Sequence, residues 1–309
     1  MKNKVNSPIV SICIPTYGRI QIMKNTIDSI YNQEVDNSLF EVCISDNSPT
    51  DETKEMLETY FKDKTNLIYN KSICEGYYNS IEALKLGKGK FLKLHNNYTM
   101  FRSEMLETFI KMIDGYLEQD CVIFNTFGAI EQLNNVGIYS SFNEFINCIT
   151  YFSTWSTSFG IWKKDFDLIC DSIDFDTMFP HTSLLFSQTN KEKYIVDNTL
   201  YFDNQDVGKK GGYNLPETFG NRYLGMVQKL YQQKFIFDKT YSNIKFGILD
   251  FIAQWYLKVR IHPEKYTFSF DNWEKIIFDL YGNEGNEYIL SYYKKHRMKS
   301  LIKKMLGKY

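Results

Sequence analysis

Residues 8–53 read PIVSICIPTYGRIQIMKNTIDSIYNQEVDNSLFEVCISDNSPTDET, and this stretch decides the fold. Two short apolar runs, residues 8–14 and 40–45, are each ended by turn residues, which is typical of buried parallel strands. Between them, apolar residues recur at helical spacing: Ile20, Met23, Ile27 and Ile30. The stretch therefore predicts a strand, a helix and a second strand, joined by a right-handed crossover in a parallel sheet.

Ligands of such sheets bind at the carboxyl ends of the strands. Those ends are residues 15–19, PTYGR, and residues 46–51, DNSPTD. The sequence thus predicts a ligand site where these two polar segments meet.

Two motifs in this stretch carry a family resemblance. Residues 11–19, SICIPTYGR, and residues 41–53, EVCISDNSPTDET, resemble the nucleotide-sugar half of family 2 glycosyltransferases, whose usual patterns are SIIIPTYNR and EIIVVDNGSTDGT. The resemblance implies an α/β fold of the GT-A type, a Rossmann-like, mostly parallel sheet flanked by helices, and extends over about residues 8–125. Its implied donor is a nucleotide sugar, with UDP as the expected nucleotide.

Composition narrows the protein class. Hydrophobic residues make up 43% and aromatic residues 17% of the chain, which argues against disorder. The net charge of -1 gives no overall attraction to nucleic acid or membrane. Six scattered cysteines form no CxxC pair, so we expect reduced core residues in a cytosolic protein. Residues 1–8, MKNKVNSP, contain no apolar signal region, and no apolar run is long enough to span a bilayer.

The periodicity of the remaining chain predicts further elements. Helices are expected at residues 52–61, 75–84, 102–119, 142–152, 223–237, 241–259, 271–281 and 287–309, with another beginning at 163. Strands are expected at residues 66–70, 91–94, 121–124, 194–196 and 199–202, and residues 154–162 are expected to form a loop that runs into a strand. We expect a GT-A domain over residues 1–213 and a helical C-terminal domain over residues 214–309.

The segment that follows the strand at 91–94 departs from the family pattern. The family ends this strand with aspartates that hold a divalent cation against the diphosphate, whereas residues 95–99 read HNNYT. Asn96 and Asn97 occupy the position of these aspartates but carry no negative charge. Three readings stay open: Mg²⁺ or Mn²⁺ held mainly by the diphosphate with help from Asn97 and a histidine, transfer without metal, or a catalytically inactive site.

By resemblance, the donor would meet side chains at the strand ends. Asp46 would accept a hydrogen bond from the uracil ring N–H, and Asn96 would face the diphosphate. The residues expected to bind the nucleotide sugar are Pro15, Thr16, Tyr17, Arg19, Asp46, Asn79 and Asn96. Structural alternatives exist for single residues, because Asp46 could cap a turn and Arg19 could form a surface ion pair. Lys71 is a further diphosphate candidate, although a lysine after a strand is commonly just exposed.

The acidic stretch at residues 172–181 lies where the family places its catalytic base. An inverting transfer needs a group that takes the proton from the acceptor hydroxyl. Asp174 or Asp176 could do so, and His181 could act as a base or as a metal ligand. Alternatively, the acids cap a helix and His181 packs near its start.

Two later segments are candidates for contacts outside the nucleotide site. Residues 206–213, DVGKKGGY, predict a mobile loop whose lysines reach the departing diphosphate, or else a solvated linker; they are not a P-loop. Residues 294–309 place several apolar side chains on one helical face among lysines: Met298, Leu301, Ile302, Met305 and Leu306. Such a helix could lie on an anionic membrane surface or pack as an ordinary last helix.

The sequence therefore favours an inverting glycosyltransferase of the hexosyltransferase type. It would act at the cytoplasmic side, at the inner face of the plasma membrane, with a bacterial surface glycan or lipid-linked molecule as acceptor and no nucleic acid partner. The alternative is a catalytically inactive GT-A module that binds nucleotide or glycan beside an active transferase.

Overall fold

The computed structural model describes residues 7–306 of the 309-residue chain. The start of the N-terminal segment and the last three residues of the expected C-terminal helix lie outside the described residues. The chain divides into two compact units, one ending at Asp206 and the other beginning at Val207, whereas the sequence placed the boundary after Tyr213.

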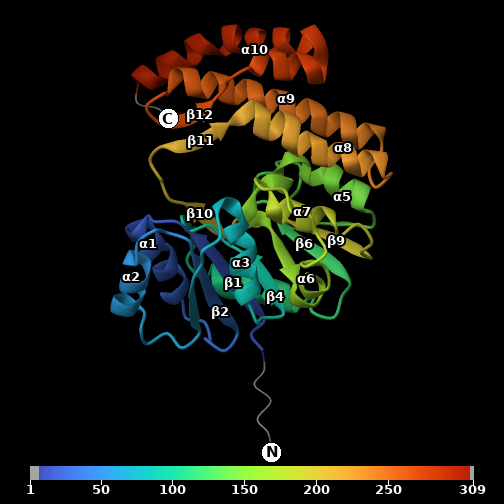
Figure 1. Ribbon diagram of the computed structural model, residues 1–309. Helices are drawn as coiled ribbons and strands as arrows, with labels where there is room; N and C mark the ends of the chain where they lie inside the picture. Colours follow the sequence, from blue (N-terminus) through green and yellow to red (C-terminus); the bar gives the residue numbers. More distant parts are fainter. Residues whose placement is uncertain (1–6, 307–309) are drawn as a thin grey trace, which may run out of the picture. The chain divides into compact units, whose positions relative to one another are not determined.

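The first unit is built on a five-stranded sheet in the order β3-β2-β1-β4-β8 (Figure 1). Its strands are β1 (Val10–Thr16), β2 (Phe40–Asp46), β3 (Leu67–Lys71), β4 (Phe91–Leu94) and β8 (Gly160–Trp162). All neighbours are parallel except β4 and β8, which are antiparallel. The predicted mostly parallel α/β sheet is confirmed, and so is the first strand-helix-strand unit.

Helices cover both faces of this sheet. Alternate residues of β1, such as Ile12 and Ile14, pack with α1 (Ile20–Tyr31), α2 (Glu52–Tyr60) and α4 (Met105–Asp114) in one apolar cluster. The side chain of Ser45 points to the opposite face, where it bonds Asn79 at the start of α3 (Asn79–Leu86). This alternation is the period of two that a strand imposes on its side chains.

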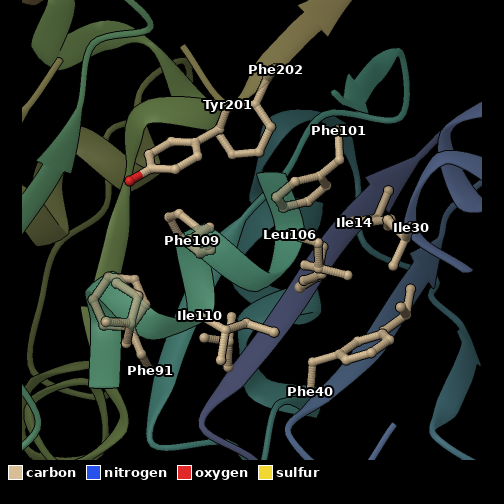
Figure 2. Packing of buried hydrophobic residues seen from close by; sticks show 14 of the residues in the cluster. Ile14, Ile30, Phe40, Phe91, Phe101, Leu106, Phe109, Ile110, Tyr201 and Phe202 are labelled. Carbon is tan, nitrogen blue, oxygen red and sulfur yellow. The ribbon is translucent and has the colours of Figure 1, made fainter. Parts of the chain in front are cut away.

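The apolar cluster extends into aromatic residues beyond the sheet (Figure 2). Phe101 and Phe202 lie edge to face, with ring centroids 4.6 Å apart. They come from β5 (Thr99–Phe101) and β10 (Phe202–Asn204), an antiparallel pair. Each fully buried ring contributes about 1.5–3 kcal/mol, so this cluster anchors the segment that follows β4. The sequence did not predict β5, because three residues give no periodicity.

A second sheet completes the first unit. β6 (Cys121–Asn125) pairs with β9 (Lys193–Asp197), and β9 pairs with β7 (Val136–Tyr139). The strand expected at 121–124 therefore exists but belongs to this three-stranded sheet. The remaining helical elements of the first unit are η1 (Gly76–Tyr78), which precedes α3, and α5 (Phe142–Ile149), η2 (Thr150–Thr154), η3 (Ser156–Ser158), α6 (Lys163–Ile169) and α7 (Pro180–Phe186), which lie between β7 and β9 in the sequence.

The second unit is mainly helical, as expected. A π-helical segment, η4 (Glu217–Tyr223), leads into α8 (Leu224–Gln232), followed by α9 (Asp238–Ile261) and α10 (Trp273–Met305). The two helices expected at 271–281 and 287–309 appear as one element interrupted at Gly282, where φ is 68°. None of the described helices carries an apolar stretch of the length that a bilayer crossing requires.

The prediction of a loop at residues 206–213 is partly wrong. Residues Lys210–Asn214 form β11, which pairs with β12 (Tyr266–Ser269). Gly211 permits this pairing, because a Cβ there would lie 2.5 Å from the backbone nitrogen of Phe268. Gly211 thus serves close strand packing, which the local composition of the segment did not reveal.

The six cysteines are all free. Cys13, Cys43 and Cys121 are buried in strands, whereas Cys74, Cys148 and Cys170 are half-buried. The expectation of core cysteines thus fits three of the six positions.

Candidate functional site

The ends of three strands meet at one edge of the main sheet. Thr16 and Asp46 are the final residues of β1 and β2 and are paired in the parallel register. After β4 the chain continues beside β1, with the backbone nitrogen of His95 donating to the carbonyl of Cys13. Asn97 then reaches across, and its Nδ2 donates a 2.9 Å hydrogen bond to Oγ1 of Thr16. The structure thus brings together three of the residues that the sequence had singled out.

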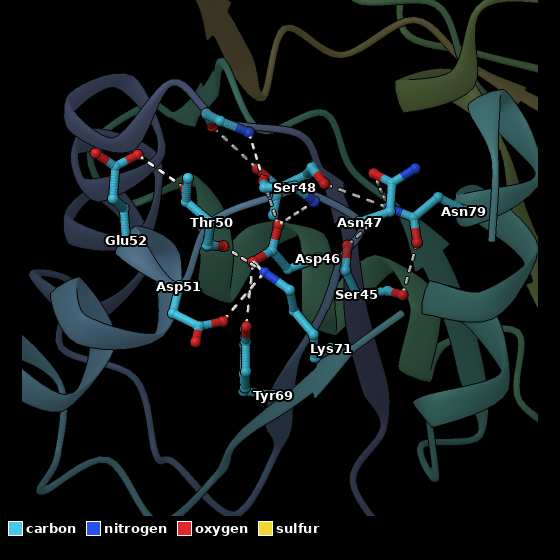
Figure 3. Close-up of polar contacts among 12 residues, drawn as sticks. Ser45, Asp46, Asn47, Ser48, Thr50, Asp51, Glu52, Tyr69, Lys71 and Asn79 are labelled. Carbon is cyan, nitrogen blue, oxygen red and sulfur yellow. Dashed lines mark hydrogen bonds and ion pairs between the residues drawn. The ribbon is translucent and has the colours of Figure 1, made fainter. Parts of the chain in front are cut away.

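Asp46 is buried at the centre of a polar cluster (Figure 3). Its Oδ1 accepts hydrogen bonds from the backbone nitrogen of Ser48, at 2.9 Å, and from the Ser48 hydroxyl. Its Oδ2 accepts from the Tyr69 hydroxyl at 3.1 Å and lies 3.4 Å from Nζ of Lys71. Burial raises the pKa of Tyr69 and the nearby Asp46 carboxylate raises it further, so the phenol stays a donor. Both carboxylate oxygens of Asp46 therefore already have hydrogen-bond donors.

Ser48 connects this cluster to the loop after β1. The backbone nitrogen of Gly18 donates to its hydroxyl oxygen at 2.7 Å. Gly18 and Arg19 both have left-handed backbone conformations, with φ of 63° and 61°, which turn the chain sharply into α1. Sequence analysis did not select Ser48 or Tyr69. Asp46-Asn47-Ser48 is nevertheless a readable turn signal, since an aspartate commonly bonds the backbone two residues on.

Lys71 joins the cluster from the edge strand. Its Nζ lies 3.4 Å from both Asp46 and Asp51 and also bonds the carbonyl of Thr50. The lysine that appeared merely exposed is thus a bridge over the buried carboxylate. Its side chain is 34% exposed, whereas that of Asp46 is 0% exposed, so Lys71 stands between Asp46 and solvent.

Asn79 fixes the start of α3 to the ends of the strands (Figure 3). Its Oδ1 accepts from the Ser45 hydroxyl at 2.7 Å, and its Nδ2 donates to the Ser45 carbonyl at 2.8 Å and to Oδ1 of Asn47 at 3.1 Å. It also lies 3.4 Å from the carbonyl of Thr16. Asn79 is buried, so its observed role is to hold these strand ends in place.

The two asparagines after β4 point in different directions. Whereas Asn97 bonds Thr16, Asn96 accepts a 2.6 Å hydrogen bond from Ser156 and donates to the Tyr98 hydroxyl at 3.0 Å. The backbone nitrogen of Asn96 also donates to Oγ1 of Thr157 at 3.2 Å. Asn96 is therefore a link to η3, while Asn97 belongs to the β1 and β2 edge.

Lys93 and His95 are buried beneath this segment. Nζ of Lys93 donates to the carbonyls of Leu94, at 3.0 Å, and Thr157. Burial lowers its pKa to about 7. His95 stacks on Phe101 with ring centroids 5.3 Å apart, and burial, aided by the Lys93 charge, lowers its pKa to about 3. The imidazole is thus neutral at physiological pH.

The other nucleotide candidates surround this edge. Tyr17 is 64% exposed, and Pro15 is half-buried in β1. The guanidinium carbon of Arg19 lies 6.0 Å from the centre of the Tyr98 ring. Burial raises the pKa of Tyr98, and the Arg19 charge opposes this rise. Arg19 is thus a positive charge next to the asparagine segment.

The predicted base region lies beside the same edge. Phe175 packs edge-on against Tyr78, with ring centroids 5.6 Å apart, and Tyr78 directly precedes Asn79. Asp174 is exposed, whereas Oδ1 of Asp176 accepts from the backbone nitrogens of Met178 and Phe179, at 2.8 and 2.9 Å, just before α7. Asp176 thus closes the turn that leads into α7 and is not the cap of that helix, whose N-cap residue is Phe179. Asp174 leaves its carboxylate in solvent.

His181 lies within α7 rather than with Asn97. Its Nε2 is 3.0 Å from the carbonyl of Thr154, and burial lowers its pKa to about 4. Among the contacts of residues 7–306, none joins His181 to Asn97. The same residues contain no group of three histidine, cysteine or acidic side chains that could hold a metal ion. Oδ1 of Asn97 is a single neutral ligand, so the protein groups alone do not fit a divalent cation site.

Comparison with known proteins supports a transferase. Residues 11–145 match the family model described as Glycosyl transferase family 2. The chain is 25% identical over 265 residues to Abequosyltransferase RfbV of Salmonella typhimurium, covering 76% of this chain and 79% of that protein. It is also 24% identical over 200 residues to the GalNAc(5)-diNAcBac-PP-undecaprenol beta-1,3-glucosyltransferase of Campylobacter jejuni, covering 63% of this chain and 59% of that relative.

The fold comparison agrees with the sheet described above. The S. aureus TarS 1-349 structure in complex with UDP-GlcNAc matches with a TM-score of 0.54 at 16% identity, covering 97% of this chain and 92% of TarS. The predicted GT-A fold is therefore confirmed. Over residues 11–145 this chain is thus similar to family 2 glycosyltransferases, and its fold is that of TarS.

Proposed function

We propose that this chain is an inverting glycosyltransferase that moves a hexosyl group from a UDP-sugar onto a bacterial surface-glycan precursor or a lipid-linked acceptor. The observation that carries the proposal is the meeting of Thr16, Asp46 and Asn97 at one edge of the sheet. Ligands of open α/β sheets bind at this edge, and the family match begins at residue 11, just before it.

In this proposal the donor nucleotide lies over the ends of β1 and β2. Asp46 accepts the hydrogen bond of the uracil ring N–H, and Thr16 contacts the nucleoside, together with Pro15 and Tyr17. Because Asp46 has no exposed surface in the structure, uracil reaches it only after the Lys71 side chain moves aside. Lys71 is part-exposed and can make that movement without opening the core.

The diphosphate would lie toward Arg19, Asn96 and Asn97. Arg19 is the basic group near the asparagine segment, and Oδ1 of Asn97 makes no hydrogen bond within the described residues. The position of Asn96 and Asn97 at the family's aspartate site remains part of this proposal. If Mg²⁺ or Mn²⁺ binds, most of its ligands would be phosphate oxygens, since a neutral amide provides little Coulomb attraction.

Transfer requires a base on the acceptor side. The acceptor hydroxyl attacks the anomeric carbon as its proton passes to a carboxylate, and the bond from that carbon to the diphosphate oxygen breaks with inversion. We assign the base to Asp174 in preference to Asp176, because one oxygen of Asp176 already accepts two backbone hydrogen bonds in the turn before α7. His181 is a weaker candidate, since both burial and its bond to Thr154 remove it from solvent.

The acceptor class and the location are proposed from the relatives. One of them carries undecaprenol, a lipid carrier, in its printed name. A lipid-linked acceptor would place this chain at the cytoplasmic face of the plasma membrane. The names of both curated relatives are those of transferases, which does not favour the alternative of an inactive binding module.

The deciding experiment measures UDP binding and donor turnover together. Calorimetry with UDP tests the nucleotide site, and release of UDP from UDP-sugars is followed with Mn²⁺ and with EDTA. We expect UDP to bind and at least one UDP-sugar to be turned over. Binding of UDP without turnover of any donor would instead support the inactive module, and absence of UDP binding would contradict the proposed nucleotide.

A further inference from the structure

The last part of α10, the red helix in Figure 1, carries several exposed apolar side chains. Met298 is 58% exposed, Ile302 49% and Met305 78%. Leu301 and Leu306 are 39% and 62% exposed. Surface helices normally turn their apolar stripe toward the core, whereas these five apolar side chains, close together in sequence, are all exposed.

The side of this helix that faces its own unit is more polar. Tyr292, His296 and Ser300 are half-buried and follow the fully buried Ile289 at steps of three and four residues. Such steps keep side chains on one helical face. Tyr292 and Ser300 also line a small cavity together with Leu257, which belongs to α9. The face of His296 and Ser300 is therefore the packed face.

The apolar stripe lies on the opposite side. With about 100° of rotation per residue, Met298 and Met305 lie roughly 160–180° around the helix from Ile289. Leu301 and Ile302 lie to either side of them. The stripe thus points away from the second unit, in agreement with the exposed fractions of these side chains.

The charges around the stripe have one sign. From 294 to 306 the ionisable side chains are all basic: Lys294, Lys295, His296, Arg297, Lys299, Lys303 and Lys304. Lys304 is 3.1 Å from Glu264 and bonds the carbonyl of Ile261. Lys295 and Lys299 lie next to the stripe, are exposed and form no ion pair within the described residues. A partner for this surface must therefore offer apolar material together with negative charge.

We propose that residues 294–306 dock on an anionic lipid surface. Met298, Leu301, Ile302 and Met305 would enter the boundary between headgroups and acyl chains. Lys295 and Lys299, which lie beside the stripe on the helix surface, would meet lipid phosphates. An apolar stripe with basic flanks is the combination that such surfaces bind. The docking surface stands on α10 alone and does not depend on the transfer reaction. If the proposed function holds, docking brings the enzyme to its lipid-linked acceptor.

Vesicle sedimentation of the full chain tests the docking surface. One vesicle contains phosphatidylcholine alone, and the other contains phosphatidylcholine and phosphatidylglycerol in equal parts. We expect binding to the anionic vesicle at least about tenfold tighter than to the neutral one, weakening as salt is added. UDP affinity is measured in parallel, so failure of docking and failure of the nucleotide site give separate results.

Variants identify the side chains responsible. Leu301→Ser combined with Ile302→Ser should lower anionic vesicle binding at least about tenfold, because two apolar side chains no longer enter the lipid. Lys295→Gln and Lys299→Gln should each lower it about fivefold. Phe278→Ser is the matched control, since Phe278 is 51% exposed earlier in α10. All variants should keep the wild-type helical content by circular dichroism.

Three outcomes would overturn the proposal. The chain could bind neither vesicle, bind both equally, or bind as well after the Leu301 and Ile302 changes as before. Self-association without vesicles that these two changes abolish would assign the face to a second copy of the chain. In that case ultracentrifugation would show a dimer for the wild type and a monomer for the variant.

Discussion

Asn97 donates a 2.9 Å hydrogen bond to the hydroxyl of Thr16, whereas the neighbouring Asn96 turns to Ser156. These two asparagines are adjacent in sequence, yet their side chains bond different parts of the structure. One belongs to the edge that we assign to the nucleotide, and the other supports η3. This difference makes Asn96 the natural control for every experiment on Asn97.

Asn97→Asp should strengthen divalent cation binding. A carboxylate adds the Coulomb attraction that the neutral amide does not provide. In calorimetry with UDP, we expect added Mn²⁺ to tighten binding to this variant by at least about tenfold more than binding to wild type. Asn96→Asp, which faces Ser156 and Tyr98, should show no such gain. Equal gains from the two variants would refute the assignment of Asn97 to the diphosphate side.

Asp46→Asn should destabilise the first unit, because a buried carboxylate with four donors around it would become an amide. We expect the free energy of unfolding in urea to fall by about 1–3 kcal/mol. Asp51→Asn removes the exposed partner of Lys71 and should change it by less than about 0.5 kcal/mol. If Asp46 also recognises uracil, only Asp46→Asn weakens UDP binding. Similar losses of stability from both variants would mean that burial at Asp46 is unimportant.

Substitution of Asp176 should affect stability, whereas substitution of Asp174 should affect turnover. Asp176→Ala removes the acceptor of two backbone hydrogen bonds in the turn before α7 and should lower the free energy of unfolding by about 1 kcal/mol, whereas exposed Asp174→Ala should leave it unchanged. Asp174→Asn should lower the rate of UDP release from the donor about a hundredfold, with UDP affinity retained. Wild-type turnover in Asp174→Asn would move the base elsewhere.

Lys93 should give stability an unusual dependence on pH. Its folded pKa of about 7 lies below the ordinary value of 10.5, so between these values the unfolded chain binds a proton that the folded chain does not. Below about pH 7, burial of the charged Lys93 side chain therefore lowers the free energy of unfolding by its full amount. This loss becomes smaller as pH rises toward 10.5. Relative to Lys93→Met, wild type should gain up to about 1.4 kcal/mol per pH unit between pH 7 and 9.

Urea unfolding at several pH values checks this expectation. Lys90→Met is the control, because Lys90 directly precedes the same strand and is exposed. It should follow the wild-type curve throughout. A constant difference between wild type and Lys93→Met over this range would mean that Lys93 stays charged in the folded protein.

The sequence alone could predict the parts of the site that local patterns determine. The first strand-helix-strand unit follows from apolar spacing and turn residues, and it places Thr16 beside Asp46. The bond from Asn97 to Thr16 joins residues 81 positions apart, so no local signal contains it. The same limit explains β11, whose pairing depends on β12, and the burial of Lys93, which depends on η3 and on Phe202.

The register between β1 and β2 also indicates where a peptide label can be inserted into the chain. Thr16 and Asp46 stay opposite one another through the seven-pair ladder of the two strands, and the exposed turn at Asn37 and Ser38 lies outside it. A short epitope or fluorophore-accepting peptide inserted at that turn should leave the ladder intact, since exposed loop tips tolerate added chain. One extra residue inside either strand would instead move every later side chain to the wrong face of the sheet.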